Sequence, residues 1–289
     1  MLWPHNKKFA VFLSHDVDQA RKHLLQALYY FYQQKRFYHL IPQFFDNPYW
    51  TFETITKLEE ECSVRSTFFF LNESIHFEIL KPKTWRPSLG RYSIFEKEIT
   101  KVIKKLDRGG WEIGLHGSYN SYRDKTLLAN EKEDLEKILG KEVYGIRQHY
   151  LNLDIPNTWQ IQRNLGLRYD ASFGFRRKTG FKDNIYYPFS AFRDKFLIIP
   201  LVIAEDNLLN ESGGDFRQAW QRCLQLINQT EKKQGLLSIL WHSHFFNAKE
   251  FPGFREIYEK IIIECKIRNA WFGTGREIYD IFKNKNLKG

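Results

Sequence analysis

Side chains that could carry out chemistry recur in this chain directly after short apolar runs. Those singled out are Asp16, Asp18, His116, Asn120, Arg147, His149, Tyr150, Asp170, His242 and His244. A mixed set of carboxylates and imidazoles suits a divalent metal such as Zn²⁺ with one position left for water. A second carboxylate can take a proton from that water, and an imidazole can protonate a leaving group. The set therefore predicts metal-assisted hydrolysis of an amide or ester.

Each residue alone also has a structural interpretation. Asp18 is well placed to cap a helix that begins near Gln19. His116 and His149 could be packed core histidines, and Arg147 could be a structural ion-pair partner. These interpretations do not explain why the residues occur together. Sequence motifs of serine hydrolases, phosphate-binding loops, dinucleotide folds and HExxH metalloproteases are missing from the sequence.

The elements that must position these residues are short strands alternating with helices. Expected strands lie at 8–13, 65–71, 111–115, 142–146, 166–170, 196–203 and 236–241, and expected helices at 50–62, 94–110, 131–140, 156–166 and 251–268. About seven strands alternating with helices predict an α/β fold with a parallel sheet, and their even spacing favours a distorted (β/α) barrel. In such folds functional groups gather at the carboxyl ends of the strands, where all of these residues fall.

Composition limits the class of protein. The chain has 289 residues, a net charge of +10, 43% hydrophobic and 27% charged residues, which excludes a disordered chain, a collagen and a membrane channel. The three cysteines, Cys62, Cys223 and Cys265, are widely spaced and suggest neither a disulfide framework nor a cysteine zinc site. No linker divides the chain, so we expect a single domain over 1–289. The segment FAVFL near the start is too short for a signal peptide, and we expect a cytoplasmic protein.

Residues 19–50 do not fit the strand and helix alternation. This segment is rich in aromatic and basic residues and is expected to form a helical insertion after the first strand. Two interpretations stay open: a packing helix with a solvated basic face, or a surface for a sugar or a lipid-linked substrate, because aromatic faces stack on sugars and basic groups attract phosphate.

The motifs SHDVD, STFFFL, EIGLHGSYNSY, GIRQHYL, LRYDASFGF and ILWHSHFF occur in the order of the polysaccharide deacetylase family. The chain resembles this family (NodB-like, carbohydrate esterase family 4) from about residue 9 to about 245. It is especially similar to the divergent branch found among O-antigen and capsule biosynthesis proteins. The resemblance implies a distorted (β/α) barrel and hydrolysis of an acetyl group from an N-acetylated, or O-acetylated, sugar.

The resemblance also implies residue roles. Asp16 matches the general base and Arg147 the arginine that orients it. Asp18 and His116 match metal ligands, and His242 matches the histidine that protonates the departing amine. The backbone N–H of Tyr150 is implied to belong to the oxyanion site. Asp170 and His244 are further candidates for contact with substrate.

One position departs from the family. The second metal histidine is expected four residues after the first, where this chain has Asn120. An Asn carbonyl is a weaker Zn²⁺ ligand than imidazole. His149 is the candidate replacement, with His244 and His15 as reserves.

Three hypotheses follow. The first is a metal-dependent sugar deacetylase whose acetylated substrate is nucleotide- or lipid-linked, with peripheral contact to the inner membrane surface. The second is a carbohydrate-binding barrel with an incomplete metal site, and the third is a hydrolase of small cyclic amides. Nucleic acid is not an expected partner, because the positive charge is neither clustered nor accompanied by a recognition motif.

Overall fold

A computed structural model gives the fold of the chain. It describes residues 3–22, 47–75 and 91–283, together with residues 24, 27, 28, 31, 32, 78, 80, 81 and 88. Most of the expected insertion at about 19–50 lies outside the described residues.

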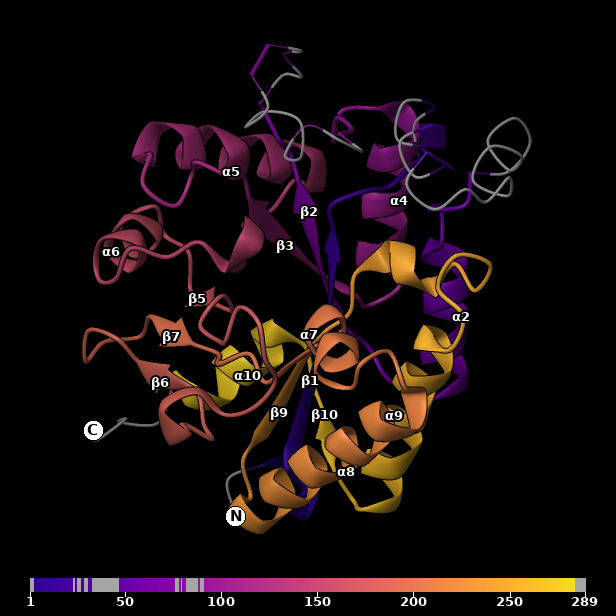
Figure 1. The fold of residues 1–289 in the computed structure, drawn as a ribbon. Coiled ribbons are helices and arrows are strands. Elements are labelled where there is room, and N and C mark those ends of the chain that lie inside the picture. Colours follow the sequence, from indigo (N-terminus) through magenta and orange to yellow (C-terminus); the bar gives the residue numbers. More distant parts are fainter. Residues whose placement is uncertain are drawn as a thin grey trace.

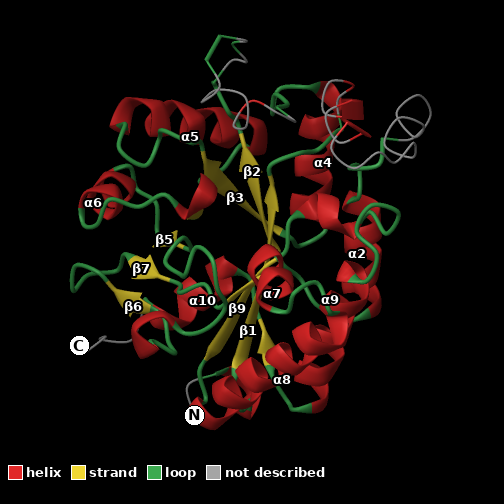
Figure 2. Ribbon diagram, viewed as in Figure 1, coloured by secondary structure: helices red, strands yellow, loops and turns green. Residues whose placement is uncertain are grey.

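A single curled sheet forms the centre of the described chain (Figures 1 and 2). Its strand order is β6-β7-β5-β4-β3-β2-β1-β9-β8, with β10 paired to β1, and only the β6–β7 pair among these is antiparallel. The strands are β1 (Ala10–Val17), β2 (Thr67–Leu71), β3 (Glu112–Gly117), β4 (Gly145–Gln148), β5 (Tyr169–Asp170), β6 (Phe189–Ser190), β7 (Leu197–Ile198), β8 (Ile203–Ala204), β9 (Leu236–Leu240) and β10 (Trp271–Phe272). The expected parallel α/β architecture of the distorted (β/α) barrel type is confirmed.

The apolar run at 196–203 differs from the expectation of one strand. Its first part, β7, pairs with β5, and its second part, β8, pairs with β9 near the opposite edge of the sheet. Between them, Leu201 N–H donates to the Phe173 carbonyl at 2.8 Å and Val202 N–H donates to the Ser238 carbonyl at 3.0 Å. The run is therefore the segment that joins the two edges of the curled sheet, and it cannot pair with one neighbour throughout.

Helices surround the outside of the sheet (Figure 1). They are α2 (Phe52–Glu61), α4 (Lys97–Arg108), α5 (Lys125–Leu139), α6 (Asn157–Asn164), α7 (Glu205–Glu211), α8 (Phe216–Lys233), α9 (Phe254–Ile267) and α10 (Gly275–Phe282). The five expected helices are present as α2, α4, α5, α6 and α9, whereas α7, α8 and α10 were not expected. In the described part of the chain, none of the helices combines the length and apolar character that a membrane span requires.

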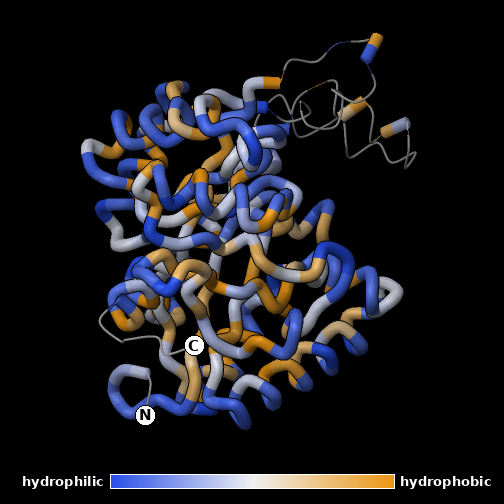
Figure 3. The backbone as a smooth tube through the Cα atoms, turned by 90° about the vertical axis from the view of Figure 1, so that its left-hand side faces the viewer, coloured by the Kyte–Doolittle hydropathy of each residue, from blue (hydrophilic) through white to orange (hydrophobic). Residues whose placement is uncertain are grey.

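Apolar side chains fill the space between sheet and helices. Phe9, Val11 and Leu13 are buried along β1, and Phe68 and Phe70 are buried along β2. Figure 3 shows hydrophobic residues concentrated in the interior and hydrophilic ones on the outer turns. Burial of such side chains stabilises the fold by roughly 1.5–3 kcal/mol each, which allows the strand ends to carry polar groups.

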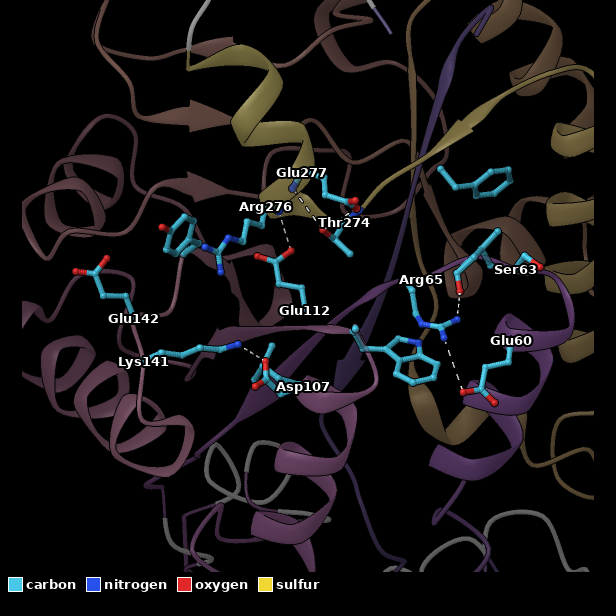
Figure 4. Close-up of a pocket in the computed structure, with 16 residues that line it drawn as sticks. Glu60, Ser63, Arg65, Asp107, Glu112, Lys141, Glu142, Thr274, Arg276 and Glu277 are labelled. Atoms are coloured by element: carbon cyan, nitrogen blue, oxygen red, sulfur yellow. Dashed lines mark hydrogen bonds and ion pairs between the residues drawn. The ribbon is translucent and has the colours of Figure 1, made fainter. Parts of the chain in front are cut away.

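A groove of about 710 Å³ lies at the amino-terminal end of the strands, away from the predicted chemistry (Figure 4). Its charged groups largely engage one another: Lys141 pairs with Asp107, and the Arg65 guanidinium lies 3.8 Å from Glu60. Glu112, at the start of β3, accepts hydrogen bonds at 2.8 Å from Thr67 Oγ1 and from the backbone N–H of Arg276. In this way Glu112 connects β3 to the first turn of α10.

Burial raises the pKa of Glu112 to about 7. Hydrogen bonds from Arg276 and Thr67 favour the ionised form and lower the pKa, but their effect is smaller than that of burial. In the unfolded chain this carboxyl ionises near its ordinary value of about 4.3. The folded state therefore binds the proton more tightly, and Glu112 lowers stability progressively as pH rises from about 4.5 to 7.

We expect Glu112→Gln to be more stable than the wild type at pH 8 by up to about 3 kcal/mol, and to lose this advantage by pH 4.5. Urea unfolding of both proteins at several pH values measures the difference. Burial also raises the pKa of Glu131 to about 7. Because Glu131 is present in both proteins, its effect on stability cancels when the two are compared. A stability difference that does not vary with pH would contradict the prediction.

Candidate metal and catalytic site

Successive side chains of β1 point to opposite faces of the sheet, so its polar residues fall into two groups. Ser14 and Asp16 both contact the buried Arg147 guanidinium. His15 points to the other face, where its Nδ1 lies 2.8 Å from the Trp241 carbonyl and its Nε2 lies 2.9 Å from Glu59 Oε1. The expectation that His15 could serve as a reserve ligand is wrong, because both ring nitrogens have partners in the layer between sheet and helices.

Arg147 holds Asp16 in place. Its Nη1 donates to Asp16 Oδ1 at 2.8 Å and to Ser14 Oγ at 2.9 Å, and its Nε donates to the Ala171 carbonyl at 3.0 Å. Both Arg147 and Asp16 are buried. The ion pair fixes the orientation of the Asp16 carboxylate and leaves its Oδ2 3.6 Å from His116 Nε2.

Asp18, His116 and His149 form a group that could hold a metal ion, because one ligand atom from each lies within 4.8 Å of the others. His116 Nε2 is 3.0 Å from Asp18 Oδ1, and His149 Nε2 is 3.5 Å from Asp18 Oδ2. The three side chains come from the carboxyl ends of β1, β3 and β4. One carboxylate and two imidazoles are a ligand set suited to Zn²⁺ with an open position.

The orientation of His116 fits a metal ion. Its Nδ1 lies 2.8 Å from the Arg147 carbonyl, and a carbonyl can only accept, so Nδ1 carries a proton and Nε2 is the nitrogen left to offer a lone pair to a metal ion. Nε2 and Asp18 Oδ1 are both buried without a hydrogen-bond partner, although they are 3.0 Å apart. Two acceptors placed this close are compatible with a cation between them.

His149 has a carboxylate behind it. Its Nδ1 is 3.9 Å from Oε2 of the buried Glu73, and the same oxygen accepts the Tyr119 backbone N–H at 3.0 Å. Burial opposes protonation of His149, but Asp18 and Glu73 raise its pKa to about 9. Burial would likewise raise the pKa of Asp18, but the imidazoles of His149 and His242 hold it well below its ordinary value.

We expect Glu73→Gln to lower Zn²⁺ affinity by roughly 10- to 100-fold, because carboxylates behind metal-binding histidines fix the ring orientation and tautomer. Gln keeps the shape and an acceptor for the Tyr119 N–H. Calorimetric titration with Zn²⁺ measures the effect, and Glu78→Gln, a change in an exposed carboxylate, is the control. Equal affinity in wild type and Glu73→Gln would show that His149 needs no such support.

His242 follows β9 and is held by Glu205, the first residue of α7. Its Nδ1 contacts Glu205 Oε1, and its Nε2 lies 3.4 Å from Asp18 Oδ2. Burial disfavours the imidazolium, but Glu205 and Asp18 raise the pKa of His242 well above its ordinary value. Glu205, Asp206 and His242 form a second group whose ligand atoms are close enough to hold a metal ion. In this group His242 Nδ1 contacts Glu205 directly, which explains why the two side chains are close without a metal ion.

A cavity of about 350 Å³ connects these side chains. Seven of the candidates line it: Asp16, Asp18, His116, His149, Tyr150, His242 and His244. Burial, with a smaller effect of His242, lowers the pKa of His244 to about 3, so this ring is neutral. Arg147 lies beneath the cavity, in contact with Asp16.

Two candidates are placed elsewhere. Asp170 is fully buried and accepts hydrogen bonds from Ser172 and Gln162, away from the cavity lining. It lies in β5, and the carbonyl of the next residue, Ala171, accepts a hydrogen bond from Arg147 Nε at 3.0 Å. Asn120 lies in the turn after β3, where its carbonyl accepts from Arg123 N–H at 3.3 Å, and it is not part of the cavity lining.

The described ends of the expected insertion lie beside the site. Lys22 pairs with Glu250, and Tyr49 Oη donates to Glu250 Oε2 at 3.0 Å. The Tyr49 ring is 5.3 Å from that of His244.

Sequence reasoning missed Glu73 and Glu205. Both were accessible to the same rule that selected the others, since Glu73 lies two residues after β2 and Glu205 directly follows β8. Neither lies in a motif that contains histidine or paired aspartates, and such motifs carried the other predictions.

Known structures share this fold. A probable polysaccharide deacetylase from Pseudomonas aeruginosa PAO1 is similar, with a TM-score of 0.66 and 15% identity over 99% of this chain and 95% of that one. The allantoinase Puue has a TM-score of 0.65 and 13% identity over 99% and 94%. A CE4 family pseudoenzyme from Bacillus anthracis has a TM-score of 0.54 and 12% identity over 96% and 66%.

These similarities define the chain as having the fold of the polysaccharide deacetylases, a curled half-barrel of mostly parallel strands with flanking helices. No protein-family model and no curated protein sequence matches the chain.

Proposed function

We propose that this protein is a metal-dependent hydrolase that removes an acetyl group from an N-acetylated sugar in surface polysaccharide biosynthesis. The observation that carries the proposal is the convergence of Asp18, His116 and His149 beside an Asp16 that is paired with Arg147. The similarity to polysaccharide deacetylase structures supports the fold in which this chemistry is built.

The chain supplies a base and an acid that both line the cavity with Asp18. Asp16, held in place by Arg147, takes the proton of the attacking water. His242, kept protonated by Glu205, gives a proton to the departing amine nitrogen. The backbone N–H of Tyr150 is the proposed donor to the oxyanion.

Asp18, His116 and His149 would hold the metal ion, with Zn²⁺ the proposed one. When bound there, the ion supplies Lewis acidity, lowering the pKa of water and drawing charge from the acyl oxygen. Asn120 is not needed as a ligand in this arrangement, because His149 provides the second imidazole.

The substrate is proposed to be linked to a nucleotide or a lipid carrier and to be processed in the cytoplasm, with peripheral contact to the inner membrane surface. Arg176 supports this, because it lines the cavity and is followed by Arg177 and Lys178, all three exposed. Such a basic corner attracts a phosphate group.

The test is acetate release from N-acetylated sugars by the purified protein. We expect stoichiometric zinc, loss of acetate release after chelation, and recovery when Zn²⁺ is added back. Acetate release that is indifferent to chelation would contradict a metal-dependent reaction.

A second candidate function is a carbohydrate-binding barrel that does not hydrolyse its ligand. It is favoured by Asn120 at the position of an expected metal histidine, and by its place outside the cavity lining. It predicts sugar binding that a chelator does not affect. Hydrolysis of a small cyclic amide is chemically equivalent at the carbonyl, and a panel of both substrate types separates it.

A further inference from the structure

Two exposed tyrosines stand at the rim of the cavity. Tyr119 is 40% exposed and Tyr150 is 37% exposed. They follow β3 and β4, the strands that also deliver His116 and His149. Their ring centroids are 5.6 Å apart and their planes are nearly perpendicular, at 85°. Together they form an aromatic step, and Tyr150 is the member that lines the cavity.

The step is joined directly to the proposed metal site. The Tyr150 ring stacks on that of His149, with centroids 4.2 Å apart and an interplanar angle of 30°. The backbone N–H of Tyr119 donates to Glu73, the carboxylate behind His149. A ligand that contacts the step is therefore next to the position where hydrolysis is proposed.

Hydrogen bonds hold the backbone of the two loops that carry the step. Tyr150 and Leu151 have φ values of +57° and +52°, a left-handed conformation that bulky residues adopt only under constraint from their surroundings. Asn152 Nδ2 donates to the Tyr119 carbonyl at 3.2 Å, linking the two loops. Arg176 donates to Asn152 Oδ1 and to the Leu151 carbonyl. Because the rings are positioned in advance, little conformational freedom is lost when they bind a ligand.

We infer that Tyr119 and Tyr150 form a stacking subsite for the pyranose ring of an oligosaccharide or glycoside, which presents its acetamido group to the metal site. Aromatic rings bury large apolar faces at a surface while their hydroxyls stay wet, which suits the C–H face and hydroxyl rim of a sugar. This inference rests on the proposed deacetylase function, and it separates a sugar substrate from a small cyclic amide that fits within the cavity alone.

The experiment compares two probes, tri-N-acetylchitotriose and p-nitrophenyl acetate, in wild type, Tyr119→Ala and Tyr119→Phe. We expect Tyr119→Ala to lower the ratio of kcat/KM for the trisaccharide to that for the small ester by about tenfold, through KM. Phe keeps the ring and should restore the ratio. An unchanged ratio in Tyr119→Ala, with acetate still released by the wild type, would overturn the subsite alone.

Calorimetric binding of the trisaccharide keeps the subsite testable if no acetate is released. In that case the deacetylase proposal fails, while about tenfold weaker binding by Tyr119→Ala, with recovery by Tyr119→Phe, still supports the subsite. Equal binding by all three proteins, or no binding by the wild type, overturns it. Thermal unfolding of each variant verifies that it is folded.

Discussion

Asp16→Asn should lower acetate release by about a thousandfold, within the range of 10²- to 10⁴-fold that positioned acid–base groups contribute. The carboxylate is buried and fixed by Arg147, and its Oδ2 lies 3.6 Å from Nε2 of the proposed metal ligand His116. An amide of the same shape can still accept from Arg147 but cannot take a proton from water. The loss should appear in kcat, because the side chain acts on the reacting water.

Stability is the alternative explanation that this experiment must exclude. Removing one partner of a buried ion pair leaves the other charge uncompensated, so we expect a measurable fall in the free energy of unfolding. Circular dichroism and zinc content verify that Asp16→Asn is folded and loaded. The matched control is Asp183→Asn, which changes an exposed aspartate outside the site. Activity of Asp16→Asn within tenfold of this control would remove Asp16 from the role of base.

The sheet could be predicted from the sequence because its strands are buried apolar runs. Each of the seven expected runs overlaps at least one observed strand. The division of 196–203 into β7 and β8 was missed although Pro200 lies between them, because the run was interpreted from its apolar pattern alone. Proline has no N–H to donate within a sheet and so argues against one continuous strand. Helix α8 was missed although Asp215 caps it and accepts from the backbone N–H of Arg217 and Gln218.

The site was predictable only at the level of strand ends. The rule that parallel strands gather functional groups at their carboxyl ends brought Asp18, His116, His149 and His242 together, and these do meet at one cavity. The same rule also selected Asp170, whose side chain turns into a buried hydrogen-bond network instead. Side-chain direction after the last strand residue depends on local backbone turns, which residue spacing does not specify.

His149→Ala should lower Zn²⁺ affinity by at least about a hundredfold, because even the groups behind metal ligands account for 10- to 100-fold. His149 Nε2 and His116 Nε2 are the two imidazole nitrogens that face Asp18 in the group able to hold a metal. Without His149 the site keeps one carboxylate and one imidazole. Titration with Zn²⁺ against a competing chelator measures the loss directly, and so does not depend on identifying the substrate.

Two comparisons make this result decisive between the candidate third ligands. His5→Ala removes an exposed histidine that precedes β1 and is not part of the cavity lining, and it serves as the control for loss of an imidazole. Asn120→Ala tests the position where an additional histidine is expected from the resemblance. We expect His149→Ala to lose zinc while Asn120→Ala and His5→Ala retain it. The reverse order would assign the third ligand to Asn120. Since Asn120 is outside the described cavity lining, this result would mean that the turn after β3 moves when the metal binds.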